Sequence, residues 1–265
     1  MFDTLTPLRE RYAYWLGMDA AQVVADREEA AGDIRALQLV LRMERDTPPS
    51  WHTAVALAAT TVARLCLDER AEPGGEWHDA LADYCRGHIR KVTRRGRGAP
   101  WHAVQDLPGI TGVEGNTEVR ALLPGLVGEL DKRVAKLQVG GTDTPVDARP
   151  EQDLGEPGRP VLQLWLPPAP VMTLGKTMAQ AGHAAMIAAA LLAADDDTTA
   201  ELVQWRDSGC PAAVTRVDAA GWAELSERTA EPEASWSDHR LLVVRDAGFT
   251  EIDPGTITVI ARAFS

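Results

Sequence analysis

The chain has 265 residues, of which 45% are hydrophobic and 25% charged, a composition typical of a globular protein with one large or two ordinary domains. No stretch approaches the roughly 18 uninterrupted apolar residues of a membrane span, and the N-terminus has no basic region followed by an apolar run, so we expect a cytoplasmic protein that does not enter a membrane. The cysteines, Cys66, Cys85 and Cys210, are odd in number and far apart, which argues against a disulfide framework and against a Cys-x-x-Cys metal site.

The net charge of −12 disfavours broad affinity for polyanions, because phosphate binding depends on Lys and Arg displacing counterions. Residues 1–150 carry 19 Lys and Arg against 22 Asp and Glu, a net −3, whereas residues 151–265 carry 8 against 17, a net −9. A surface that binds nucleic acid is therefore expected on the N-terminal half.

Residues 1–139 are predicted to form a helical bundle. Helix-forming residues dominate, and Ile34, Leu37 and Leu41 follow one another at spacings of three and four. The predicted elements are helices within 19–45, at 55–67 after the Pro-containing break 47–50, at 77–93 and at 118–137, with an ordered loop at 96–115.

Residues 140–160 are polar and rich in Pro and Gly, with almost nothing to bury, and this composition predicts a linker. No internal repeat of fixed period is evident.

Residues 161–265 alternate between strand and helix patterns. Strands are predicted at 161–166, 212–217, 241–245 and 256–261, and helices at 175–194, 195–207 and 218–229. The order β-α-α-β-α-β-β indicates a three-layer α/β domain, in which helices cover a mixed four-stranded sheet. The overall class is thus a helical bundle followed by an α/β domain.

The first chemical motif lies at the start of the predicted helix 175–194. Backbone amides at a helix N-terminus favour anions, and Lys176, directly after Gly175, adds a positive charge. Helical spacing places Gln180 and His183 on the same side as Lys176. His183 is either a site residue or a core histidine satisfied by one hydrogen bond.

The second motif follows the predicted strand 241–245. Asp246 stands at the strand end, where α/β sheets usually bind ligands, and Gly248 and Thr250 follow in the loop. Thr250 would orient a water or a carboxylate beside Asp246. Alternatively, Asp246 caps the following turn.

A phosphate-binding P-loop is a competing interpretation of Gly175-Lys176-Thr177. It is disfavoured because the position five residues before Gly175 is Pro170, which has no N–H to contribute to an amide cradle. No Gly-x-Ser-x-Gly motif and no cluster of metal ligands is present, so we expect neither a serine hydrolase nor a metal site.

Together the two motifs resemble the type 2 peptidyl-tRNA hydrolase family, over about residues 160–262. The family pattern is Gly-Lys-x-x-Ala-Gln-x-x-His-Ala-Ala, followed later by Asp-Ala-Gly-x-Thr-x-Ile-x-Pro-Gly-Thr-x-Thr-Val, and both occur here in order. The resemblance implies hydrolysis of the ester between a peptide and tRNA, no metal or other cofactor, and frequently a homodimer. It implies catalytic roles for Lys176, Asp246 and Thr250. The supporting positions are Gly175, Gln180, His183 and Gly248.

Two departures from the family pattern remove positive charge. The family usually has a second lysine just before the Gly-Lys pair, where this chain has Thr173-Leu174, and an arginine where this chain has Phe249. A basic cluster in the N-terminal half is a candidate replacement that would contact tRNA, with Trp101 stacking on a base. Its members are Arg86, Arg90, Lys91, Arg94, Arg95, Arg97 and Trp101. The alternative is a solvated basic face near a helix end.

The sequence thus favours a peptidyl-tRNA hydrolase. Two alternatives stay open: a non-catalytic module of the same fold that binds RNA or protein, and a hydrolase of another acyl adduct.

Overall fold

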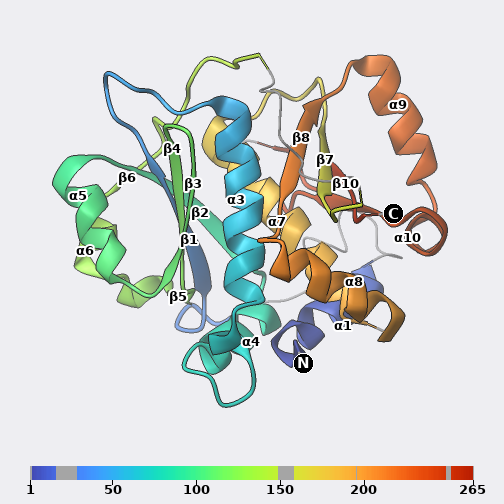
Figure 1. The fold of residues 1–265 in the computed structure, drawn as a ribbon, viewed down its shortest axis with the longest axis horizontal. Helices are drawn as coiled ribbons and strands as arrows, with labels where there is room; N and C mark the ends of the chain where they lie inside the picture. The colour runs from blue at the N-terminus through green and yellow to red at the C-terminus, as the bar shows by residue number, and fades with distance from the viewer. Residues whose placement is uncertain (1, 16–28, 149–157, 195, 249–251, 265) are drawn as a thin grey trace.

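The computed structural model describes residues 2–15, 29–148, 158–194, 196–248 and 252–264, which form two β-sheets with helices on their faces (Figure 1). The N-terminal part contains α1 (Thr6–Trp15), β1 (Arg35–Arg42), α3 (Trp51–Cys66), α4 (His78–Arg86), β2 (Arg90–Gly96), α5 (Gly98–Ala103), β3 (Gly109–Glu114), β4 (Thr117–Leu122), β5 (Gly125–Leu126), α6 (Lys132–Ala135) and β6 (Gln138–Val139). The C-terminal part contains β7 (Leu162–Leu166), α7 (Leu174–Leu192), α8 (Asp196–Asp207), β8 (Ala212–Arg216), α9 (Ala219–Arg228), α10 (Pro232–His239), β9 (Leu241–Arg245) and β10 (Ile257–Arg262).

The prediction of an N-terminal helical bundle is wrong, because this half is built on a sheet. Leu37 and Leu41 lie in strand β1, and successive side chains of that strand enter different clusters: Leu39 packs in the central core and Val40 in an outer cluster. A strand that is buried on both faces shows a continuous apolar run, which periodicity does not distinguish from a buried helix.

Most of the other elements predicted for the N-terminal half also differ from the observed ones. The predicted helix 118–137 is replaced by β4, β5 and the short α6, the predicted helix 77–93 ends at Arg86 before β2, and the predicted loop contains α5 and β3. The helix predicted at 55–67 is present as α3, beginning at Trp51 after Ser50, whose hydroxyl accepts a hydrogen bond from the Thr53 amide at 3.2 Å.

The two sheets have the same strand topology. The first has the order β3-β4-β1-β2-β6, with β5 beside β1, and the second has the order β9-β10-β7-β8. In each half two parallel strands, β1 and β2 or β7 and β8, precede and follow a long helix, α3 or α7. An antiparallel pair, β3 and β4 or β9 and β10, lies next to the first strand of that half. Helix α10 is an addition to the predicted β-α-α-β-α-β-β order.

The pairing registers of the two sheets also match. Leu39 pairs with Ala121 in the first sheet, and Leu164 pairs with Ala261 in the second. Ala121 in turn pairs with Ile110, and Ala261 pairs with Leu242. The equivalent strands β1 and β7 share a Leu-Gln-Leu sequence at 37–39 and 162–164. The two halves are therefore an internal structural duplication, although the sequence shows no repeat of fixed period.

Helices α3 and α7 pack against each other between the two sheets, as Figure 1 shows. One buried cluster contains residues of both helices and of the inner faces of both sheets, while separate outer clusters lie beside α5 and α6 on one side and α9 on the other. The halves thus share one core, with α3 and α7 as its common layer.

The described part of the predicted linker is anchored rather than free of contacts. The Thr142 side chain is 1% exposed, the Asp147 carboxylate lies 2.8 Å from Nδ1 of His52, and the Asp143 carboxylate accepts a hydrogen bond from the Leu174 amide at 2.8 Å. This segment therefore joins the N-terminal half to the start of α7. Among the described helices, none combines the length and hydropathy that crossing a bilayer requires.

Candidate active site between the two halves

A cavity of about 280 Å³ lies where the two halves meet. Tyr12 of α1 and Lys91 of β2 line it from the N-terminal half. From the C-terminal half, α7 contributes Lys176, Gln180 and His183, and Asp246 follows the end of β9. The two predicted motifs therefore meet in one cavity, to which the N-terminal half also contributes.

The Asp246 carboxylate is the centre of the polar contacts in this cavity. It is 3% exposed and forms an ion pair with the Lys176 ammonium through Oδ2. The Gln180 amide donates to the same oxygen at 2.7 Å, and the Gln180 carbonyl accepts from the Thr258 hydroxyl at 2.8 Å. The ion pair with Lys176 and the hydrogen bond from Gln180, which Thr258 of β10 holds in turn, keep the Asp246 carboxylate in place.

The loop after β9 supplies a further donor to Asp246. The Gly248 amide donates to Oδ1 at 2.8 Å, and the Gly248 backbone has a φ of 77°. A Cβ atom at this position would lie 2.7 Å from Cδ of Pro254. Glycine is thus required here both by backbone conformation and by the close approach of the proline ring.

The N-terminal half holds the start of α7, where the first motif lies. The Thr93 hydroxyl of β2 donates to the Gly175 carbonyl at 2.7 Å. A Cβ at Gly175 would lie 2.9 Å from the Thr142 hydroxyl, so the glycine permits this close contact. At the helix start, the Thr173 side chain accepts from the Lys176 amide at 3.3 Å. Lys176 is therefore placed by contacts from both halves.

His183 lines the same cavity one helical step beyond Gln180, and its Nδ1 lies 3.4 Å from the Lys91 ammonium. Burial, followed by the nearby charges of Lys91 and Lys176, lowers the pKa of His183 well below its ordinary value. The ring is therefore neutral at physiological pH.

Most of the predicted site residues come together. Gly175, Lys176, Gln180, His183, Asp246 and Gly248 lie in or beside the cavity. Thr250 and Phe249 lie outside the described residues, so the role of Thr250 stays a prediction.

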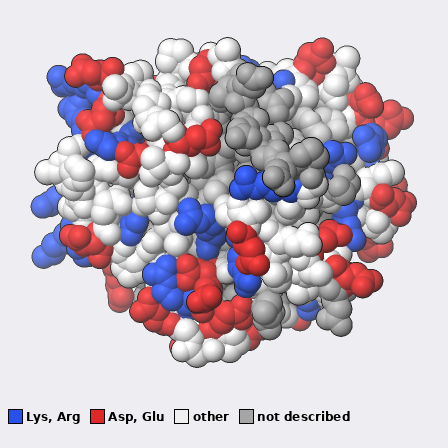
Figure 2. All heavy atoms as spheres, viewed as in Figure 1, with Lys and Arg blue, Asp and Glu red and all other residues white. Residues whose placement is uncertain are grey.

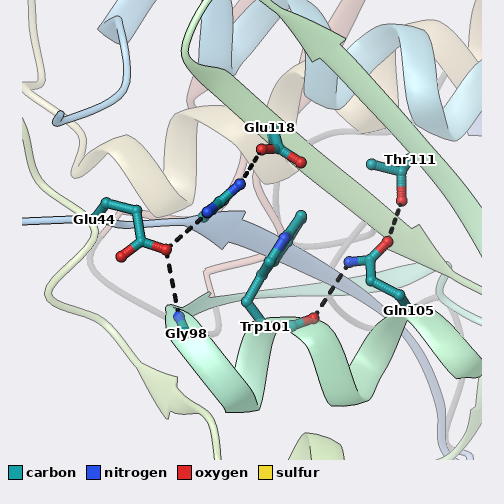
Figure 3. Close-up of polar contacts among 7 residues, drawn as sticks. Glu44, Gly98, Trp101, Gln105, Thr111 and Glu118 are labelled. Carbon is teal, nitrogen blue, oxygen red and sulfur yellow. Dashed lines mark hydrogen bonds and ion pairs between the residues drawn. The ribbon is translucent and has the colours of Figure 1, made fainter.

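The predicted stacking role of Trp101 is not compatible with its burial. The Trp101 side chain is 2% exposed and packs with Val40, Val104 and Leu122. Figure 3 shows the indole pointing from α5 toward the sheet, and the Trp101 carbonyl accepts from the Gln105 amide at 3.4 Å. A base has no access to this ring, because it belongs to the outer core cluster.

The predicted cluster of cations is dispersed, because its central members lie on strand β2 rather than on a helix and its exit loop. Arg90 pairs with Glu29, Lys91 enters the cavity, and Arg94 donates to Gln38 at 2.7 Å. Arg86, Arg95 and Arg97 remain exposed. On the face drawn in Figure 2, Lys and Arg are interspersed with Asp and Glu rather than gathered in one patch.

Among the residues that the structure describes, no group of three or more His, Cys, Asp or Glu side chains is arranged to hold a metal.

Sequence analysis missed several residues of the site. Thr258 belongs to the second motif but was not singled out, and Lys91 was assigned to the basic cluster. Tyr12 lines the cavity, and its hydroxyl donates to the Val243 carbonyl at 3.2 Å. Lys91 and Tyr12 lie far from the motifs in sequence, so only the packing of the two halves identifies them.

The geometry agrees with a comparison against known protein families. Residues 166–263 match the family model of peptidyl-tRNA hydrolase PTH2. The family resemblance inferred from the two motifs is therefore confirmed for this region. The PTH2 region contains Lys176, Gln180, His183 and Asp246, whereas Tyr12, Lys91 and the entire first sheet lie outside it. No curated protein and no solved structure matches the chain.

Proposed function

We propose that the protein hydrolyses the ester bond between peptide and tRNA, with Lys176, Asp246 and Thr250 as its catalytic residues. The observation that carries the proposal is the contact between Lys176 and Asp246, two residues of the PTH2 region that line the cavity between the halves. These two groups come from motifs 70 residues apart in sequence, 176 and 246.

The paired groups have complementary roles in ester hydrolysis. Asp246 would orient a water molecule and accept its proton as the water attacks the ester carbonyl. Lys176 would stabilise the negative charge that develops on the carbonyl oxygen, since a cation in a partly buried site acts more strongly than in water. Gln180 and the Gly248 amide keep the carboxylate in one orientation.

Hydrolysis of another acyl adduct is a second candidate. It is favoured by the dispersal of the arginines predicted to contact tRNA and by the burial of Trp101. Such an enzyme would use the same Lys176–Asp246 pair but would not need the nucleic acid.

The first experiment compares cleavage of peptidyl-tRNA by the wild-type protein and by Asp246→Asn, which removes the carboxylate at nearly constant size. We expect the cleavage rate to fall roughly 10²- to 10⁴-fold, the range for the loss of a general base. Glu114→Gln is the matched control, since Glu114 occupies the position of the first sheet that corresponds to Asp246 but is exposed. This variant should cleave at the wild-type rate.

Absence of cleavage by folded wild-type protein would contradict the proposal. An N-acylated aminoacyl ester of adenosine, used as a second substrate, separates the candidates. Cleavage of this ester that depends on Asp246, without cleavage of peptidyl-tRNA, would favour the acyl-adduct hydrolase. Binding without cleavage of either substrate would favour a non-catalytic module.

A further inference from the structure

Lys91 reaches the active-site cavity from the N-terminal half, outside the region that matches the family model. Its aliphatic stem passes over Gly182 of α7. A Cβ atom at Gly182 would lie 3.2 Å from Cδ and 3.3 Å from Cε of Lys91, and 3.1 Å from Cγ2 of Val62. The missing side chain at Gly182 thus provides the room through which Lys91 enters.

Four acceptors of the described residues surround the Lys91 ammonium, the weakest being the thioether Sδ of Met186 at 3.6 Å. The Tyr84 hydroxyl lies at 3.2 Å, the Ile89 carbonyl at 3.3 Å and Nδ1 of His183 at 3.4 Å. The Tyr84 hydroxyl itself donates to the carbonyls of Ile89 and Arg90, so it meets Lys91 as an acceptor. An ammonium group has three protons and accepts none. Because a thioether sulfur is a weak acceptor, the hydroxyl, the carbonyl and Nδ1 are the stronger partners of these protons.

The groups around Lys91 leave its charge uncompensated. Cys66 of α3, Cys85 and Tyr84 of α4, and His183 and Lys176 of α7 face this region. Burial raises the pKa of both thiols and of the Tyr84 hydroxyl, so these groups are neutral at pH 7. Within the described parts of the chain, Lys91 forms no ion pair with a carboxylate, and His183 is the titratable residue of the cavity that it contacts.

The contact determines where the proton of His183 lies. The ring is neutral, and one of its nitrogens must accept while the other donates. Because Nδ1 faces an ammonium, Nδ1 is the acceptor and Nε2 carries the proton.

We propose that Lys91 is a positioning residue of the cavity: its ammonium holds His183 in the Nε2–H tautomer, and this N–H binds an acceptor atom of the substrate. The identity of the substrate rests on the proposed function, whereas the tautomer does not. His183 lies seven residues beyond Lys176 on the same face of α7, about 10 Å along the helix axis. His183 therefore contacts a part of the substrate that is distant from the ester on which Lys176 and Asp246 act.

The tautomer is measured by nitrogen NMR of protein labelled with ¹⁵N-histidine, with His183→Gln to assign the signal. We expect His183 in the wild-type protein to be Nε2–H at pH 7. In Lys91→Met, which keeps the stem but has no N–H, the ring should populate both tautomers. Lys136→Met, at an exposed lysine, is the control and should leave the signal unchanged. A wild-type His183 in the Nδ1–H form, or an unchanged Nε2–H form in folded Lys91→Met, would overturn the proposal.

A titration of the wild-type protein covers the case in which Lys91→Met does not fold. Burial lowers the pKa of Lys91 to about 8. Once Lys91 is neutral, its amine no longer enforces an acceptor at Nδ1, so the His183 signals should shift as the pH rises through this value. Signals that stay constant from pH 7 to pH 10 would contradict the proposed coupling.

Kinetics give a second readout that a purely structural role would not produce. Lys91→Met should raise KM for peptidyl-tRNA about tenfold, the effect of weakening one hydrogen bond, while kcat is retained. A fall in kcat at constant KM would overturn the assignment to binding. If the wild-type protein shows the Nε2–H form but cleaves no peptidyl-tRNA, the proposed function fails and the role of Lys91 toward His183 stands.

Discussion

The two halves of the molecule share a strand topology and a pairing register. The second half nevertheless supplies Lys176, Asp246 and the other polar side chains of the predicted motifs to the cavity. Counted from the capping residues Ser50 and Thr173, the positions of Lys176, Gln180 and His183 in α7 correspond to Thr53, Leu57 and Thr60 in α3. The first half thus keeps the fold without the site. The fold fixes where a site can lie, and the side chains on one helix determine whether chemistry is available.

The first half instead contributes packing and single side chains to the second. Strand β9 forms an edge of its sheet, so one side of its backbone has no strand to pair with. There the buried Tyr12 hydroxyl accepts from the Val243 amide at 3.3 Å and donates to the Val243 carbonyl. Thr93 and Lys91 reach α7 from β2. The comparison therefore predicts that neither half is independent of the other.

The largest effect is expected from a cavity in the shared helical layer. Leu65 of α3 is fully buried in the central core, and Leu65→Ala should lower the free energy of unfolding by about 2–5 kcal/mol. Denaturant unfolding measures this change, and hydrogen exchange should show that both sheets lose protection together. Val113→Ala, at a residue that is 62% exposed, should change the free energy by no more than about 0.5 kcal/mol. Loss of protection in the first sheet alone would show that the halves are independent units.

A smaller effect is expected when α7 is made to resemble α3 at one position. Gln180→Leu copies Leu57 and leaves Asp246 and Thr258 each without one buried hydrogen-bond partner. The free energy of unfolding should fall by roughly 1–3 kcal/mol and hydrolysis should slow, because the carboxylate loses its fixed orientation. Gln204→Leu, at an exposed glutamine of α8, is the control. Unchanged stability and activity in Gln180→Leu would mean that the amide does not support Asp246.

The sequence predicted the second half of the fold better than the first for a physical reason. In the second half, Pro and Gly residues and the Asp218 cap mark the element boundaries, and the Asp218 side chain does accept from the Gly221 amide at 2.8 Å. In the first half, β1 is covered on both faces and β2 carries several basic residues, so neither shows the alternation of a half-exposed strand.

The candidate site was predictable only as far as the motifs extend. Lys176, Gln180, His183 and Asp246 follow from local sequence, and the structure brings them to one cavity. The sequence shows Lys91 as one cation among several. The direction of its side chain depends on the packing of β2 against α7 and on the space above Gly182. Residue spacing within one motif carries no information of that kind.

The smallest effect concerns the charge of Lys91. Burial lowers its pKa from 10.5 to about 8, so between these values the unfolded chain binds more protons than the folded protein. Raising the pH through this window therefore increases the stability that the wild-type protein has relative to Lys91→Met. Between pH 7 and pH 8.5 the gain should be below about 1 kcal/mol, given that one pKa unit corresponds to about 1.36 kcal/mol. The buried thiols titrate in the opposite sense, and taking the difference between the two proteins removes the part of their contribution that does not depend on Lys91. Denaturant unfolding of both proteins at the two pH values measures the change, with Lys136→Met expected to follow the wild type. A difference that is constant or decreases with pH would mean that Lys91 is as well solvated as an exposed lysine and is not held against His183.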